Sequence, residues 1–143
     1  GCFVVFCYRR RGILFFDVDR RAVLLFRRDN KPNIPFPNCI DILGGHVDEG
    51  ETPEEAIVRE AVEETGITEI VEVVDSNYHY EFTDEGRSHV EYIFGAEVPA
   101  NTNVRLSHEH DDLRWVNKDE ALQLLKWPGN KEGLRKLCER LGI

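Results

Sequence analysis

The stretch GHVDEGETPEEAIVREAVEETGI, residues 45–67, decides the fold of this chain. Its second half has the marks of a single helix, because Thr52 suits the N-cap position and Pro53 suits the first helical turn. Glu55 stands three residues after Thr52, which is the sequence pattern of a capping box. Gly66 suits the left-handed residue that often follows a helix. We therefore predict an irregular acidic loop followed by a helix that begins after Thr52 and ends at Gly66.

Carboxylates are concentrated in this stretch. Residues 48–64 contain a single cation, Arg59, and the following acids: Asp48, Glu49, Glu51, Glu54, Glu55, Glu60, Glu63 and Glu64. On a helix that turns about 100° per residue, Glu60, Glu63 and Glu64 fall on one arc, where they repel one another. The apolar arc beside them is predicted to pack against the protein and consists of Ile57, Val58, Ala61 and Val62. The acidic arc is then either a solvated face or a cation site.

The order of the fixed residues resembles the Nudix box, G-x5-E-x7-R-E-U-x-E-E-x-G-U. The matching positions are Gly45, Glu51, Arg59, Glu60, Glu63, Glu64, Gly66 and Ile67. Ala61 is the single departure, since the pattern has Ile, Leu or Val there. The resemblance favours the cation site. It also implies an α+β Nudix fold, a mixed β-sheet sandwiched between helices, and we predict a single domain over residues 1–143.

The resemblance implies a hydrolase that splits a nucleoside diphosphate linked to another moiety, as in nucleoside triphosphates, nucleotide sugars and dinucleoside polyphosphates. The implied metal ligands are the backbone carbonyl of Gly45 and the carboxylates of Glu60, Glu63 and Glu64. Oxygen ligands of this kind suit Mg²⁺ or Mn²⁺, which would activate a water. Arg59 and Glu51 take an orienting role as an ion pair.

The general base stays open between two glutamates. Glu109 lies on the loop Ser107-His108-Glu109-His110-Asp111, and the segment through Trp115 resembles that of dinucleoside polyphosphate hydrolases. Glu63 is the competing base. The predicted catalytic residues are accordingly Glu63, Glu64, Glu109 and Arg59.

Residues for substrate binding are predicted outside the box. Arg27 and Arg28 end an apolar strand and offer bidentate contacts to phosphate, although a solvated strand end explains them equally well. Phe36, in a loop with three prolines, is the candidate for stacking on a base or sugar. Tyr78 and Tyr80 are further candidates, but alternating aromatics are also typical of a half-buried strand.

The remaining elements follow from residue patterns. Strands are predicted over residues 3–8, 13–18, 22–26, 69–82, 88–98 and 113–116. Residues 29–38 read as a loop, and residues 13–26 as a hairpin. Asn117 and Glu120 repeat the capping signature before another helix, Pro128-Gly129 is expected to interrupt it, and an amphipathic segment follows over residues 131–141.

Bulk properties exclude several classes of partner. A net charge of −9 argues against binding a nucleic acid duplex, which requires Lys and Arg to neutralise phosphates. No run of 18 apolar residues is present, so no membrane is expected as a partner. The cysteines lack a paired spacing, which predicts buried reduced thiols and a cytoplasmic location; they are Cys2, Cys7, Cys39 and Cys138. The expected partner is a small-molecule nucleotide. The sequence does not decide between a monomer and a homodimer.

Two rival functions remain. An isopentenyl-diphosphate isomerase has a similar fold but uses a cysteine, and Cys39 lies near the glycines. A catalytically silent Nudix-fold module would bind a ligand without turning it over. The complete set of box carboxylates favours the hydrolase over both.

Overall fold

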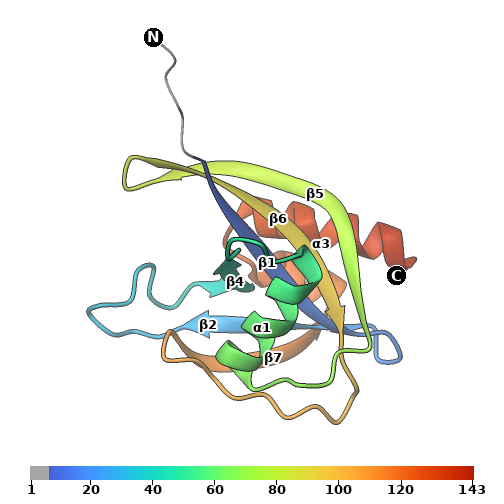
Figure 1. The fold of residues 1–143 in the computed structure, drawn as a ribbon. Coiled ribbons are helices and arrows are strands. Elements are labelled where there is room, and N and C mark those ends of the chain that lie inside the picture. The colour runs from blue at the N-terminus through green and yellow to red at the C-terminus, as the bar shows by residue number, and fades with distance from the viewer. Residues whose placement is uncertain (1–6) are drawn as a thin grey trace.

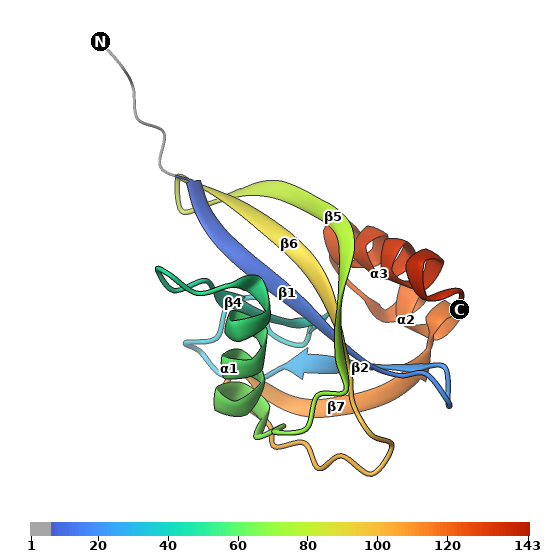
Figure 2. The same cartoon turned by 45° about the vertical axis from the view of Figure 1, so that its right-hand side comes forward.

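A computed structural model describes residues 7–143 as a seven-stranded mixed sheet with helices on both faces (Figures 1 and 2). Its strands are β1 Cys7–Asp17, β2 Ala22–Arg28, β3 Ile40–Asp41, β4 Leu43–His46, β5 Glu72–Asp84, β6 Arg87–Glu97 and β7 His110–Asn117. Its helices are α1 Pro53–Thr65, α2 Lys118–Leu124 and α3 Pro128–Leu141. The predicted α+β architecture, a mixed sheet between helices, is confirmed.

Strand β1 lies at the centre of the sheet and pairs with three other strands. The main strand order is β3-β2-β1-β6-β5, while β4 pairs with β1 and β7 pairs with β2. Strands β1 and β6 are parallel along residues 7–16 of β1, and the other pairs are antiparallel. On its other edge β1 pairs first with β4, at residues 10–13, and then with β2, at residues 16 and 17. Strand β4 and strand β2 therefore share one edge of β1, each along a different part of it.

Two apolar cores lie on opposite faces of the sheet, because successive side chains of a strand point in opposite directions. Ile13 and Phe15 of β1 belong to the core beneath α1, which also contains Ile57. Leu14 and Phe16 belong to the core beneath α2 and α3, which also contains Leu134. In Figure 2 the sheet lies between α1 on one side and α2 with α3 on the other.

The N-terminal strands differ from the prediction. Instead of a break between two strands at Arg9-Arg10-Arg11, β1 continues from Cys7 to Asp17, because parallel pairing with β6 satisfies its backbone throughout. Arg11 is accommodated by stacking over the ring of Tyr92, 4.8 Å from its centroid. Most of the strand predicted over residues 3–8 lies outside the described residues. The predicted β1–β2 hairpin is confirmed.

The helix of the box has the predicted ends. The Thr52 hydroxyl accepts a hydrogen bond from the backbone N–H of Glu55, 3.1 Å away. Gly66 adopts a left-handed conformation with φ of 70° and donates its N–H to the Val62 carbonyl. Both local signals were therefore sufficient to place this helix.

The packing face of α1 was predicted wrongly in part. Ile57 and Ala61 are fully buried, but Val58 and Val62 remain 45% and 41% exposed. The face that meets the sheet is rotated toward the acids and includes Glu60, which is only 8% exposed. One of the three acids thus lies within the packing face instead of beside it.

The Pro128-Gly129 pair begins a helix and does not interrupt one. Pro128 occupies the first turn of α3, where a missing N–H costs nothing. Gly129 lies against the ring of Tyr80, and a Cβ atom at this position would be 2.6 Å from ring carbons. The glycine here permits close approach of α3 to β5.

Two further expectations concern the cysteines and membrane-spanning segments. Cys138 is buried, as expected, and burial raises the pKa of its thiol. Cys39 is only half-buried, because β3 lies at the end of the sheet, and the thiols of Cys2 and Cys7 lie outside the described part. None of the described helices is both long and apolar enough to cross a membrane.

Candidate active site

The site begins where β4 meets α1 across the backbone of Gly45. A Cβ atom on Gly45 would lie 2.4 Å from the carboxyl carbon of Glu60 and within 2.7 Å of both carboxylate oxygens. Any side chain at this position would therefore displace Glu60. Only a residue without a side chain allows the backbone of β4 to come this close to Glu60.

The three predicted metal-binding glutamates differ in their surroundings. Glu60 is buried, and burial raises the pKa of its carboxyl group despite the opposing hydrogen bond from Arg59. Glu60 and Glu64 both line a large cleft, whereas Glu63 is 55% exposed outside its lining and accepts a hydrogen bond from Arg59. Across residues 7–143 no three His, Cys, Asp or Glu side chains already converge as a ligand set.

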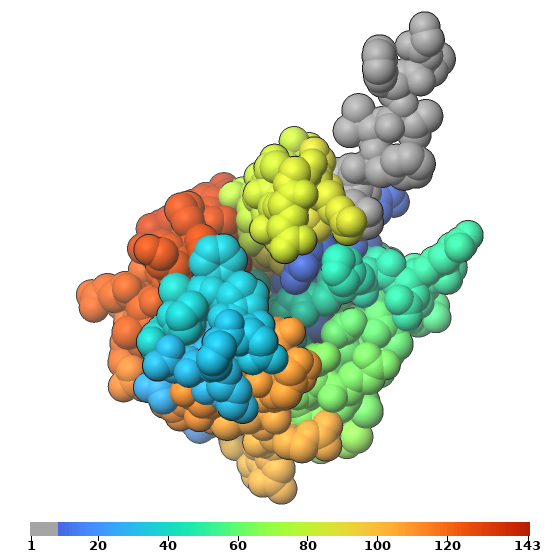
Figure 3. Space-filling model, turned by 90° about the vertical axis from the view of Figure 1, so that its left-hand side faces the viewer, coloured from blue at the N-terminus to red at the C-terminus, as the bar shows by residue number. Residues whose placement is uncertain are grey.

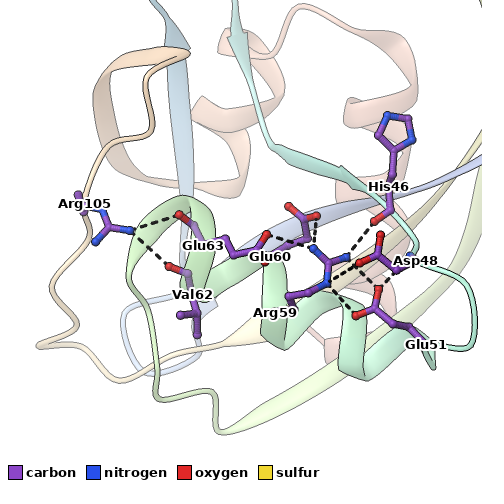
Figure 4. A network of polar contacts seen from close by, with 8 residues as sticks. All are labelled: His46, Asp48, Glu51, Arg59, Glu60, Val62, Glu63 and Arg105. Atoms are coloured by element: carbon purple, nitrogen blue, oxygen red, sulfur yellow. Dashed lines mark hydrogen bonds and ion pairs between the residues drawn. The ribbon is translucent and has the colours of Figure 1, made fainter.

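Arg59 joins the acidic loop to the helix (Figure 4). Its Nε and Nη2 atoms donate to the two carboxylate oxygens of Glu51 at 2.8 and 2.9 Å, which is the ion pair expected from the box. Its Nη1 atom donates to Glu60 at 2.9 Å and to Glu63 at 3.1 Å, and Nη2 also reaches the carbonyl of His46 at 3.2 Å. One guanidinium thus orients two glutamates of the helix against the loop.

These contacts shift the pKa values of both partners. The hydrogen bond to Glu51, more than any other cause, raises the pKa of Arg59, and the same bond lowers the pKa of Glu51. Both groups are held in their charged forms. The pair is a fixed positive and negative scaffold at neutral pH.

The loop that carries Glu109 is fixed by a buried histidine. The ring of His110 contacts Asp41 through Nε2 at 3.0 Å and the Ser107 hydroxyl through Nδ1 at 3.1 Å. The Ser107 hydroxyl also accepts the N–H of Glu109, and the Glu109 carbonyl accepts the N–H of Asp29. The Glu109 side chain is left 45% exposed in the cleft lining. Sequence reasoning did not identify Asp41, which is distant in the chain.

The two adjacent arginines of β2 separate into different environments. Arg28 lines the cleft, donates to the Pro35 carbonyl at 2.7 Å and to Asp41 at 3.1 Å, and lies 3.9 Å from Glu109. Arg27 lies outside the cleft lining and pairs with Asp111 at 2.7 Å, which raises the pKa of Arg27. Side chains of consecutive strand residues point to opposite faces of the sheet. Arg27 and Arg28 therefore cannot both contact the same substrate in the cleft.

Aromatic side chains gather at the other end of the cleft. Phe36 is 53% exposed and meets Trp127 edge to face, with ring centroids 4.9 Å apart. Tyr78 and Tyr80 stack on each other in the same lining, at 6.2 Å. Trp127 was missed from the sequence, although its position directly before the Pro128 helix start could have suggested a side chain at an element junction.

The cleft that joins these groups has a volume of about 1280 Å³ and reaches from α1 across β4 to the start of α3. Figure 3 shows the hollow between the light-blue loop of residues 29–38, the yellow tip of β5 and β6, and the green helix α1. This volume exceeds the usual upper range of about 1,000 Å³ for small-ligand pockets. It is large enough for an extended ligand with a charged part and an aromatic part.

Comparisons with known proteins agree with this arrangement. The family model described as NUDIX domain matches residues 8–137. An octanoyltransferase of Myxococcus xanthus is 33% identical over 99 residues, which cover 66% of this chain but only 27% of that protein. An asymmetrical bis(5'-nucleosyl)-tetraphosphatase of Rattus norvegicus is 36% identical over 101 residues, covering 66% of this chain and 69% of that protein. A crystal structure of a C. elegans Ap4A hydrolase in a binary complex has the same fold, with a TM-score of 0.76 at 23% identity over 94% of this chain and 98% of that one.

Proposed function

Because the chain belongs to the NUDIX domain family, we propose that it is a Nudix pyrophosphohydrolase acting on bis(5'-nucleosyl) polyphosphates. The observation that carries the proposal is the Glu60 carboxylate packed against Gly45, at one end of a cleft that also holds aromatic rings. The rat relative named as a bis(5'-nucleosyl)-tetraphosphatase supports this class of substrate.

The donor set fits Mg²⁺ or Mn²⁺. Such ions take hard oxygen ligands and keep several waters. Gly45, Glu60 and Glu64 all line the cleft, and Glu63, which accepts a hydrogen bond from Arg59, would have to leave that contact to join them. The raised pKa of Glu60 reflects a buried carboxylate that a cation would stabilise. When bound, the ion supplies counter-charge to the diphosphate and acidifies a water.

The chain's own residues then have separate tasks. Arg59 holds Glu60 in place through their 2.9 Å contact, and Glu51 holds Arg59. A carboxylate must accept the proton of the attacking water, and Glu109 and Glu63 are the two candidates. Glu109 is a side chain of the cleft lining with free carboxylate surface, whereas Glu63 is engaged by Arg59, so Glu109 is the better placed of the two.

A substrate panel tests the proposal. The full chain would be incubated with diadenosine tetraphosphate, ATP and ADP-ribose in Mg²⁺ or Mn²⁺, and products would be separated by ion-exchange chromatography. Cleavage of the dinucleoside tetraphosphate with the highest kcat/KM is the expected result. Equal or higher kcat/KM on ATP or ADP-ribose would overturn the assigned substrate class.

Two substitutions locate the activity at α1. Glu60→Gln and Glu64→Gln are expected to lower kcat on the order of a thousandfold, because each removes a charged oxygen ligand. Loss of activity through unfolding is not expected for Glu60→Gln, because a buried charge is costly and its removal should not destabilise the fold. Glu54→Gln is the matched control: it is exposed on the same helix, outside the cleft lining, and should keep wild-type kcat.

The rival functions have distinct signatures. A silent binding module would bind ADP-ribose or a dinucleotide with no product in any metal. An isomerase would depend on Cys39, whose side chain is absent from the described cleft lining. Cys39→Ala should therefore leave hydrolysis intact. The cytoplasmic location stays a prediction, which cell fractionation can test. Whether the chain forms a homodimer is also untested, and light scattering can measure it.

A further inference from the structure

A second polar group lines the cleft on the face of the sheet opposite to Glu60. Arg10 of β1 and Glu91 of β6 are neighbours in the parallel register, and Tyr80 of β5 pairs with Glu91 in the next ladder. All three line the cleft, as does Asn130 of α3. Their positions in the strands place them on the face covered by α3, whereas Glu60 lies on the α1 face.

The contacts of this group converge on Glu91. The Arg10 Nε atom lies 3.5 Å from Oε1 of Glu91, and the Tyr80 hydroxyl donates a hydrogen bond to Oε2. The amide of Asn130 donates to the Tyr80 oxygen at 3.3 Å. Burial raises the pKa of Tyr80 most, and the nearby negative charge of Glu91 raises it further, so the hydroxyl keeps its proton. Glu91 is 6% exposed and has both oxygens engaged.

Arg10 is held differently from Arg28, another arginine of the cleft lining. Arg28 is already bound by the Pro35 carbonyl and Asp41 and lies near Glu109. Arg10 pairs with Glu91 through one edge, its side chain stays 29% exposed, and its Nη2 atom points toward β4, 3.1 Å from the position of a Cβ on Gly44. Its remaining N–H groups are therefore available to a ligand in the cleft.

Two consecutive glycines of β4 relate this group to the carboxylates of α1. Gly44 faces Arg10, and Gly45 faces Glu60. Consecutive Cα atoms are about 3.8 Å apart, so the two groups flank a single step of backbone. Neither glycine has a side chain, so β4 presents only backbone between Arg10 and Glu60 at these two positions.

We propose that Arg10 binds a phosphate group of the substrate beyond the two held at Glu60, and that Glu91 and Tyr80 are positioning residues for Arg10. The inference rests on the proposed function, and it deepens that function by selecting substrates that contain more than two linked phosphates. ADP-ribose, with two phosphates, lacks the group that Arg10 contacts.

Kinetics on two substrates test the selection. Arg10→Gln is expected to lower kcat/KM for diadenosine tetraphosphate about tenfold to hundredfold, mainly through KM, because a charge-assisted contact is lost. The loss on ADP-ribose should stay below about threefold. Arg9→Gln is the matched control, since it removes the same charge from the neighbouring exposed position on the other face of β1. Equal losses on both substrates would overturn the selection.

A double-mutant cycle tests the positioning role. Glu91→Gln and Tyr80→Phe should each raise KM for the tetraphosphate several-fold, about three to ten, and leave kcat unchanged. In the Arg10→Gln background neither should raise KM further. Additive effects would show that Glu91 and Tyr80 act independently of Arg10. Should Glu91→Gln fail to fold, Tyr80→Phe, which removes only one oxygen, carries the same test.

A binding measurement separates this inference from the proposed function. Isothermal titration with inorganic tripolyphosphate needs no turnover, so it is informative even if the chain hydrolyses none of the panel. The wild type and Arg9→Gln should bind it about tenfold more tightly than Arg10→Gln. Equal affinities in all three proteins would refute the role of Arg10, whereas inactivity on the panel alone would refute only the proposed function.

Discussion

The α1 side of the cleft and its α3 side are built from different kinds of sequence and carry different chemistry. On the α1 side, the acidic groups come from one stretch, residues 45–67, and they surround Arg59. On the α3 side, side chains from β1, β5, β6 and the start of α3 contribute one ion pair and a set of aromatic rings. The first side suits a divalent cation and the second suits a phosphate and a base. Four substitutions can break or sharpen this division.

Among these four, the largest effect is expected at Gly45, one of the two glycines at the boundary. Gly45→Ala places a Cβ atom 2.4 Å from the carboxyl carbon of Glu60, so Glu60 must move and kcat should fall on the order of a hundredfold. Gly44→Ala meets the flexible end of Arg10 at 3.1 Å, so it should raise KM while kcat stays within about threefold. Steady-state kinetics on both variants measure the contrast. Similar kcat losses in the two would mean that β4 is not a boundary between separate functions.

Arg59→Lys is expected to lower kcat about tenfold or more. A lysine is a point charge and cannot make the paired contacts of Nε and Nη2 with Glu51. The measurement is kcat at saturating Mg²⁺, with Arg114→Lys as the control, because Arg114 is exposed on β7 outside the cleft lining. Wild-type kcat in Arg59→Lys would show that charge alone, without the paired geometry, orients Glu60.

Loss of an aromatic ring should affect binding and leave the chemistry intact. Phe36→Ala removes the exposed partner of Trp127 and is expected to raise KM about tenfold, the usual loss for one stacked base. Val18→Ala, at another exposed apolar position, serves as the control. If kcat fell and KM did not change, Phe36 would belong with the catalytic side of the cleft.

The smallest effect concerns stability away from the cleft. The hydrogen bond from Arg20 lowers the pKa of Asp17 below its ordinary value of 3.8. A lowered folded pKa adds stability above the unfolded value, and this stability is lost as the pH falls through the folded value. Asp17→Asn should therefore cost about 0.5 kcal/mol at pH 7, and the difference should begin to shrink near pH 3.8 and vanish only below the folded-state pKa, which is lower. Urea denaturation across this pH range measures it, and a cost that persists in acid would point instead to the hydrogen bond that the Asp19 N–H donates to Oδ1 of Asp17.

Sequence patterns predicted helices and strands correctly where residues close in the chain determine the structure. The caps of α1, the hairpin of β1 with β2, and the cap of α2 at Asn117 each depend on residues close in sequence, and each is present. Errors occurred where a distant partner decided the outcome. Parallel pairing with β6 carried β1 through three arginines, and contact with Tyr80 gave Gly129 a place inside α3.

The candidate site divides in the same way. The spacing of the box indicated Gly45, Glu60 and the pairing of Arg59 with Glu51, because these residues meet within one loop and helix. The metal, the substrate and the general base stay predictions. Adjacent Arg27 and Arg28 were equivalent in sequence, and only the strand geometry assigned Arg28 to the cleft.

The sequence by itself determined that residues 45–67 would form an acidic loop followed by a helix, because the caps and spacing that control both are local. Only the tertiary structure decided which acid is buried, since that depends on how α1 is rotated against the sheet. It also decided that Arg10, Glu91 and Tyr80 share one wall of the cleft, because pairing among β1, β6 and β5 joins residues up to 81 positions apart (Glu91 minus Arg10).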